Sequence, residues 1–184
     1  MGPVAGARRR GRGWQTQTMA ASAPGGQPLV AVVDIDGVVA DVRHRLHLVE
    51  SRPKRWPEFF AAADDDPALE VGVSLVHQLA ADHDVVWLTG RPERTRAATV
   101  RWLAAHDLPA GTLLMRGDRD FRPARVTKRD ELRRLRRTRE VGVVVDDDPE
   151  VVALLQADGF PVRLADWLPH SSTLRAAQER EGRT

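Results

Sequence analysis

Short apolar runs alternate with amphipathic segments from residue 29 onward, and this alternation constrains the fold more than any other feature. The runs are rich in Val and Leu and lack a polar alternation, which is typical of strands buried on both faces. They predict strands at residues 29–33, 85–88, 112–115, 141–145 and 160–163. Segments with a helical apolar period lie between them, at residues 69–81, 92–106, 128–138 and 149–158. This order predicts an α/β domain with a doubly wound parallel sheet.

Proline, aspartate and glycine mark the ends of the predicted helices. Pro92 and Pro149 are expected in the first turn of their helices, where a missing N–H costs nothing. Asp148, just before Pro149, is interpreted as a helix N-cap. Gly159 follows the last helix, as expected for a glycine that ends a helix.

The domain organisation follows from a change in composition. Residues 1–28 are rich in Gly, Ala, Pro and Arg without an apolar period, which predicts a disordered tail. Met19 lies inside this stretch, so a start at either Met1 or Met19 stays open. Residues 29–170 are expected to form one domain, since the 184-residue chain is of single-domain length. Residues 171–184 are expected to be a C-terminal helix or tail.

Composition also excludes several classes of protein. The chain has no cysteine, which excludes disulfide frameworks, thiolate zinc sites and cysteine nucleophiles. No apolar run approaches the roughly 18 residues of a membrane span. No apolar stretch follows the N-terminal arginines, as a secretory signal would require. We therefore expect a cytoplasmic protein without a membrane partner.

The net charge of +2 conceals an asymmetry. Residues 1–28 hold four arginines and no acid, so residues 29–184 hold 24 basic side chains against 26 acidic ones. Overall charge therefore does not favour nucleic-acid binding, and any such contact requires a local basic patch. Residues 116–139, with eleven basic and four acidic side chains, are the candidate patch. The alternative is that they form a solvated helix face.

Polar side chains follow four of the predicted strands, where ligands bind in sheets of this kind. Carboxylates are hard oxygen ligands that favour Mg²⁺, and a metal beside a hydroxyl and cationic donors is suited to phosphoryl transfer. The polar segments are Asp34-Ile35-Asp36-Gly37, Thr89-Gly90-Arg91, Arg116-Gly117-Asp118 and Asp146-Asp147-Asp148.

At these residues the chain resembles the haloacid dehalogenase superfamily of phosphotransferases, over about residues 29–168. The superfamily motif Asp-x-Asp-Gly is matched by residues 34–37, its Thr or Ser by Thr89, and its acidic pair by Asp146-Asp147. Lys128 is the candidate for the lysine expected at a helix start. The chain has 26 arginines and only two lysines, so a lysine in this window is unexpected by chance.

The resemblance implies a role for each of these residues. Asp34 would attack phosphorus and form an aspartyl-phosphate. Asp36 would protonate the leaving oxygen and then accept a proton from water. Thr89 and Lys128 would bind the phosphoryl oxygens. The implied Mg²⁺ ligands are the Asp34 carboxylate, the Asp36 carbonyl and Asp146, with Asp147 orienting Lys128 or the metal waters.

Finer details resemble the phosphatase domain of bacteriophage polynucleotide kinase and its bacterial relatives. These include Asp-Gly-x-x-Ala-Asp at residues 36–41 and Leu-Thr-Gly-Arg-Pro at residues 88–92. The resemblance implies that Arg45, Gly90 and Arg91 contribute to substrate binding. One residue departs from the pattern: Ala124 stands where the family has an Asp, and Asp118 or Asp120 is a candidate substitute.

Only two short helices, around residues 42–51 and 56–63, fit between the first motif and the next core helix, so we expect a minimal cap and an open site. The predicted function is removal of phosphate from polynucleotide 3′ ends. A nucleotidase or other small-molecule phosphatase stays open as an alternative, as does a catalytically weak nucleic-acid-binding module. The partner is a phosphorylated nucleic-acid end or a nucleotide, and the sequence leaves the oligomeric state undetermined.

Overall fold

The computed structural model describes residues 26–50, 52–169 and 176. The predicted N-terminal tail lies outside the described residues except for residues 26–28, and the predicted C-terminal segment except for residue 176. Within the described part, no helix is long and apolar enough to span a membrane.

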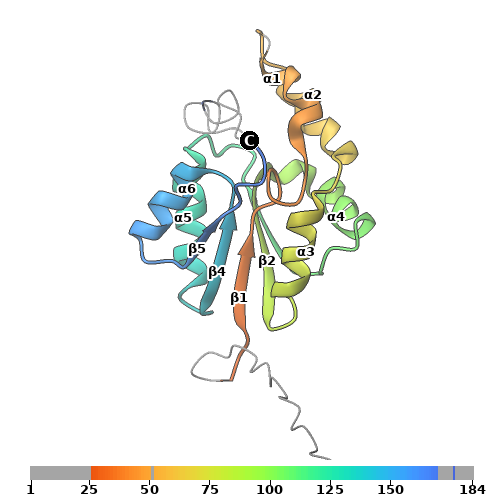
Figure 1. Cartoon of the computed structure of the whole chain (residues 1–184). Helices are drawn as coiled ribbons and strands as arrows, with labels where there is room; N and C mark the ends of the chain where they lie inside the picture. The colour runs from red at the N-terminus through yellow and green to blue at the C-terminus, as the bar shows by residue number, and fades with distance from the viewer. Residues whose placement is uncertain (1–25, 51, 170–175, 177–184) are drawn as a thin grey trace, which may run out of the picture.

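The described residues contain one parallel sheet of five strands in the order β3-β2-β1-β4-β5 (Figure 1). The chain moves outward from β1 to β3 and then returns to the other side of β1. The reversal puts a switch point between β1 and β4, where ligands bind in doubly wound sheets. The predicted fold class is confirmed. The strands are β1 (Leu29–Val33), β2 (His83–Pro92), β3 (Thr112–Arg116), β4 (Val141–Asp146) and β5 (Val162–Leu164).

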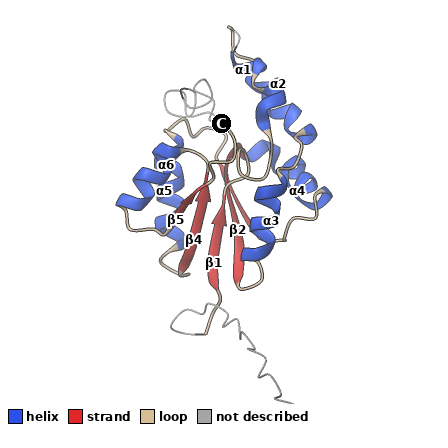
Figure 2. Ribbon diagram, viewed as in Figure 1, coloured by secondary structure: helices blue, strands red, loops and turns tan. Residues whose placement is uncertain are grey.

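Helices cover both faces of the sheet (Figure 2). On one face lie α3 (Glu70–Leu79) and α4 (Arg96–Ala105), and on the other lie α5 (Ala124–Leu135) and α6 (Pro149–Ala157). Successive side chains of a strand point to opposite faces. Val33 of β1 therefore joins the core under α3 and α4, whereas Val32 joins the core under α5 and α6.

Two predicted helix starts are wrong. Pro92 ends β2, with φ −71° and ψ 148°, and a 3-10 turn, η3 (Glu93–Thr95), separates it from α4. The fixed φ of proline is as compatible with extended backbone as with a helix, which is why the sequence pattern misplaced it. Helix α5 begins at Ala124, directly after Pro123, so Lys128 lies in its second turn and not at its start.

The start and end predicted for α6 are confirmed. Pro149 lies in the first turn, and the Asp148 side chain accepts a hydrogen bond of 2.9 Å from the Glu150 backbone N–H. Gly159 follows the helix with φ +80°, a left-handed conformation that glycine adopts without strain.

A small helical segment lies beyond the carboxyl edge of the sheet, at the top of Figure 1. Its apolar core contains the aromatic side chains Trp56, Phe59 and Phe60, packed against Leu48 and Val49. This segment is the minimal cap that was predicted. Its elements are η1 (Val42–Arg45), α1 (His47–Glu50), α2 (Trp56–Ala61) and η2 (Ala62–Asp65).

Candidate active site

A lysine bridges two aspartates at the switch point between β1 and β4. Asp34 directly follows β1, Asp146 ends β4, and Lys128 reaches both from α5. The Lys128 Nζ donates hydrogen bonds of 2.6 Å to Asp34 Oδ2 and 2.7 Å to Asp146 Oδ2. All three side chains are buried. Three residues far apart in the sequence therefore form one compact charged centre.

A third carboxylate completes a set suited to a metal ion. Oxygens of Asp34, Asp146 and Asp147 lie within 4.8 Å of one another. Gly37 makes room for this arrangement, because a Cβ at that position would lie 2.1 Å from Asp147 Oδ2. Hard oxygen donors without sulfur or imidazole suit Mg²⁺. The Asp36 carboxylate accepts hydrogen bonds from Arg45 and Arg91, so the contribution expected from Asp36 to this set is its backbone carbonyl.

Burial governs the protonation of this centre. Burial raises the pKa of Asp34 to about 7 and that of Asp146 to about 6, although Lys128 opposes both shifts. Burial would lower the pKa of Lys128, but its two carboxylate partners outweigh this effect and raise it. One ammonium group thus shares a buried site with several carboxylates, an excess of negative charge that a divalent cation would neutralise.

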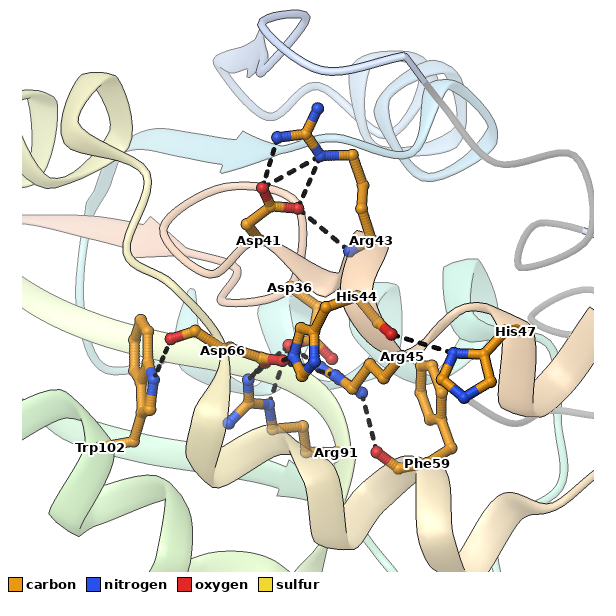
Figure 3. A network of polar contacts seen from close by, with 10 residues as sticks. All are labelled: Asp36, Asp41, Arg43, His44, Arg45, His47, Phe59, Asp66, Arg91 and Trp102. Carbon is orange, nitrogen blue, oxygen red and sulfur yellow. Dashed lines mark hydrogen bonds and ion pairs between the residues drawn. The ribbon is translucent and has the colours of Figure 1, made fainter.

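The second aspartate of the motif belongs to a separate network of buried charges (Figure 3). Asp36 Oδ1 accepts hydrogen bonds from Arg45 Nη2 at 2.9 Å and from Arg91 Nη2 at 2.6 Å. The same guanidinium groups also bind Asp66, Arg45 through its Nε at 2.7 Å and Arg91 through its Nη2 at 2.8 Å. Burial would raise the pKa of Asp36, but the two arginines lower it to about 2. Asp36 is therefore held in its ionised form.

Arg45 and Arg91 were predicted to bind substrate, and the structure shows what each contacts. Both are fully buried, with exposures of 0% and 1%, and both are committed to Asp36 and Asp66. Their contacts hold the Asp36 carboxylate in place, and substrate binding by Arg45 and Arg91 stays a prediction. Gly90 is buried between Thr89 and Arg91 in β2.

Asp66 is a site residue that sequence reasoning missed. It accepts hydrogen bonds from Arg45 and Arg91, lies 2.7 Å from His44 Nε2, and its backbone carbonyl accepts a bond of 2.8 Å from Trp102 Nε1. The sequence shows it only as the last of three aspartates before a proline, which is typical of a turn. Its burial is a tertiary property that this local pattern does not reveal.

Thr89 and Lys128 line one small cavity of about 40 Å³ on the β3 side of the centre. Thr89 Oγ1 accepts a hydrogen bond of 3.2 Å from the Arg91 backbone N–H. The two predicted phosphoryl-binding groups therefore face the same space. The other lining residues are Leu88, Met115, Arg116, Gly117, Asp120, Thr127 and Glu131.

Arg116, at the end of β3, is a second site residue whose part was not predicted. Its side chain is buried, and its Nη1 donates to the backbone carbonyls of Asp120 and Arg122 at 3.3 and 2.8 Å. Its Nε and Nη2 are buried without a hydrogen-bond partner in the described part of the chain. Burial lowers the pKa of Arg116. A buried cation thus lines the cavity shared by Thr89 and Lys128.

The predicted basic patch divides into two parts that lie at opposite edges of the sheet. Arg139 contacts Asp84 at 2.6 Å and the Pro28 carbonyl at 3.2 Å, both at the amino edge. Arg133 pairs with Asp158, at the end of α6, and Arg134 with Glu131. Arg139, at the end of the candidate patch, therefore lies far from the carboxyl edge, and the exposed pairs of Arg133 and Arg134 favour the alternative of a solvated helix face for this part. Because α5 runs from the carboxyl edge to the amino edge, its basic C-terminal end points away from Asp34.

The sheet order, the Asp-x-Asp pair after β1 and the acidic pair after β4 define the chain as a haloacid dehalogenase-like phosphatase. The chain belongs to the family of the polynucleotide kinase PNKP phosphatase domain, whose sequence model matches residues 28–163. The resemblance to the haloacid dehalogenase superfamily and the finer resemblance to the polynucleotide kinase phosphatase domain are both confirmed. No significant match was found among curated proteins.

Solved structures agree on the fold. A chain of the Pnkp1/Rnl/Hen1 RNA repair complex is 23% identical, with a TM-score of 0.63 over 82% of this chain and 46% of that one. A class C acid phosphatase from Bacillus anthracis with tungstate bound is 16% identical, with a TM-score of 0.55 over 84% and 79% of the two chains. A haloacid dehalogenase-like hydrolase from Streptococcus pneumoniae is 11% identical, with a TM-score of 0.55 over 83% and 92%. The chain spans about half the length of the RNA-repair chains it matches.

Proposed function

We propose that the protein is a Mg²⁺-dependent phosphatase that removes the phosphate from polynucleotide 3′ ends through an aspartyl-phosphate at Asp34. The observation that carries this proposal is the convergence of Asp34, Lys128, Asp146 and Asp147 at one switch point. The cavity lined by Thr89 and Lys128 adjoins this centre and offers donors for phosphoryl oxygens. Membership of the polynucleotide kinase phosphatase family supports the nature of the substrate.

In the first step a carboxylate oxygen of Asp34 attacks phosphorus, and the bond from phosphorus to the 3′ oxygen breaks. Lys128 and Thr89 hold the phosphoryl oxygens, and Asp36 donates a proton to the departing oxygen. A metal ion bound by Asp34, Asp146 and Asp147 would supply positive charge beside the phosphoryl group. In the second step a water molecule attacks the aspartyl-phosphate and releases inorganic phosphate, while Asp36 accepts the proton of that water.

The arginine pair around Asp36 bears on both steps. Arg45 and Arg91 hold Asp36 ionised, which is the state that the second step requires. For the first step Asp36 must take up a proton when the substrate enters. The anionic phosphate provides a reason for this uptake, because a negative charge nearby raises the pKa of a carboxyl group.

Two features support a polymer end over a small metabolite. The cap is small, because it consists only of the short elements η1, α1, α2 and η2. Arg116 lines the cavity, and Arg119 is exposed on the loop that follows. These cations suit a chain of phosphates.

Ala124 occupies the first position of α5, where the related phosphatases have an aspartate, and it is buried. Of the two candidate substitutes, Asp118 pairs with the exposed Arg94, whereas Asp120 lines the cavity. We propose that Asp120 supplies the missing carboxylate.

A panel of substrates with Mg²⁺ tests the proposal. The panel contains a 3′-phosphorylated oligonucleotide, the same sequence with a 5′-phosphate, the matching mononucleotides, and para-nitrophenyl phosphate. We expect the highest kcat/KM for the 3′-phosphorylated oligonucleotide. Equal kcat/KM for oligonucleotides and mononucleotides would contradict the proposal and favour a nucleotidase instead. Binding of oligonucleotides without any hydrolysis would favour a nucleic-acid-binding module.

A further inference from the structure

The loop between β3 and α5, residues 117–122, forms an open hollow beside the cavity of the site. All six residues of the loop line this hollow, which has a volume of about 880 Å³. Gly117 and Asp120 line both the hollow and the cavity that contains Thr89 and Lys128. The hollow and the cavity of the site therefore adjoin one another.

Phe121 lies on the wall of this hollow with 56% of its surface exposed. Within the described part of the chain it is the only aromatic among the exposed large hydrophobic residues. A single exposed apolar side chain is ordinary. Phe121 differs in its place, because its loop borders the site and carries the exposed cations Arg119 and Arg122.

The loop is held in place on both sides of Phe121. Arg116 Nη1 donates hydrogen bonds to the backbone carbonyls of Asp120 and Arg122, the two residues that flank Phe121. Arg122 also pairs with Asp120 at 2.7 Å and with Asp130 on α5 at 2.9 Å. The Asp120 backbone N–H closes a turn onto the Gly117 carbonyl at 2.9 Å. The ring of Phe121 is thus presented by an ordered backbone, which lowers the entropy cost of binding.

We propose that Phe121 is a stacking platform for the base of the 3′-terminal nucleotide, with Arg119 contacting the sugar–phosphate backbone. This inference rests on the proposed function and names the part of the substrate that the loop recognises. Every base has an aromatic face, so stacking on phenylalanine selects an unpaired end without selecting its sequence. Arg119 has no ion-pair or hydrogen-bond partner in the described part of the chain, so its charge is available to a phosphate.

The test compares Phe121→Ala with wild type on two 3′-phosphorylated oligonucleotides that differ only in the terminal base. One carries the base and the other is abasic at that nucleotide. Wild type is expected to have a KM about 5- to 150-fold higher for the abasic substrate, the range expected for loss of one stacked base. Phe121→Ala should raise KM by a similar factor for the substrate with the base, and should leave the abasic substrate and para-nitrophenyl phosphate unchanged. Phe121→Trp should retain wild-type KM.

Val100→Ala is the matched control, since Val100 is also an exposed apolar side chain, 50% exposed, but lies on α4. It should leave every KM unchanged. An equal effect of Phe121→Ala on both oligonucleotides, or no effect on either, would overturn the proposal. An equal effect would mean that the change acts through the shape of the loop.

Binding separates this inference from the proposed function. The same two oligonucleotides are titrated into the Asp34→Asn protein, with and without Phe121→Ala, by fluorescence anisotropy. Phe121-dependent binding without hydrolysis by wild type would support the platform and contradict the phosphatase substrate. Hydrolysis without dependence on Phe121 would support the phosphatase and overturn the platform. The absence of both binding and hydrolysis would overturn the platform and the proposed function together.

Discussion

Asp34 and Asp36 are two residues apart, yet their surroundings drive their pKa values in opposite directions. Burial raises the pKa of Asp34 to about 7, whereas for Asp36 the arginines Arg45 and Arg91 outweigh burial and lower the pKa to about 2. Carboxyl groups whose environments separate their pKa values in this way are suited to different chemical roles. The two side chains are predicted to be separable by substitution.

Asp34→Asn should lower turnover by roughly a thousandfold or more, because an amide cannot attack phosphorus, while the fold is retained. Asp36→Asn should slow an alkyl 3′-phosphate much more than para-nitrophenyl phosphate, whose leaving group needs little protonation. Both are checked by steady-state kinetics, with thermal melting as the control for folding. Turnover by Asp34→Asn within about tenfold of wild type would contradict its role as the nucleophile. Equal slowing of both substrates by Asp36→Asn would contradict its role as the general acid.

Mg²⁺ should stabilise the protein more at about pH 8 than at about pH 5. The folded-state pKa values of Asp34 and Asp146 are raised from 3.8 to about 7 and about 6. Without a metal ion, protonation of these two carboxyl groups stabilises the folded state at low pH. This stabilisation is lost as the pH rises through about 4 to 7. A metal ion replaces the lost protons, so its effect grows with pH. Thermal melting with Mg²⁺ and with a chelator measures the difference, and Asp146→Asn should reduce it. An equal Mg²⁺ effect at both pH values would argue against this metal site.

At the scale of elements, buried charge pairs join the cap to the sheet. Arg45 comes from η1, Arg91 from β2, and Asp66 from the end of η2, and their ion pairs converge on Asp36 after β1. The Arg45 guanidinium also lies 4.2 Å from the centre of the Phe59 ring in α2. Four segments that are separate in sequence are thereby fixed around one carboxylate (Figure 3).

Asp66→Ala should lower the free energy of unfolding by about 3–5 kcal/mol, because it leaves two buried guanidinium groups short of a partner. Chemical denaturation provides the measurement. Asp64→Ala is the control, since Asp64 pairs with Arg101 on the surface, with exposures of 45% and 67%, and such pairs contribute about 0–1 kcal/mol. If Asp66→Ala lowered the free energy of unfolding no more than Asp64→Ala does, the buried network would not be what holds the cap in place.

At the scale of the whole molecule, the positive charge that could meet a polynucleotide lies at the carboxyl edge, on the loop after β3. Arg119→Gln should reduce the salt dependence of oligonucleotide binding by about one unit of slope in log Kd against log salt, because one phosphate contact is lost. Arg133→Gln and Arg134→Gln should leave that slope unchanged, because these side chains already pair with the carboxylates of Asp158 and Glu131. Fluorescence anisotropy at several salt concentrations checks both expectations. A larger effect from Arg133 or Arg134 would indicate a binding path across α5.

Much of the fold and of the candidate metal centre was predictable from the sequence, for a local reason. Buried parallel strands appear as short runs of Val and Leu, and the residue after such a strand lies at the carboxyl edge whatever the rest of the chain does. Asp34 and Asp146 lie at that edge as this rule predicts, whereas Thr89 lies inside β2, which continues past the predicted end to Pro92. Lys128 was found by its rarity, although the predicted start of its helix was four residues late.

The tertiary structure alone decided the partners of the charged side chains. Asp64, Asp65 and Asp66 are the same residue type in a row, and only Asp66 is buried against two arginines. The arginines from Arg116 to Arg139 are likewise similar in sequence, yet Arg116 lies inside the site and Arg139 contacts the amino edge of the sheet. Periodicity records which face of an element is apolar, but an ion pair depends on the distance between segments that the fold brings together. For that reason the sequence by itself determined the elements and the carboxylates after the strands, whereas packing determined which charges meet.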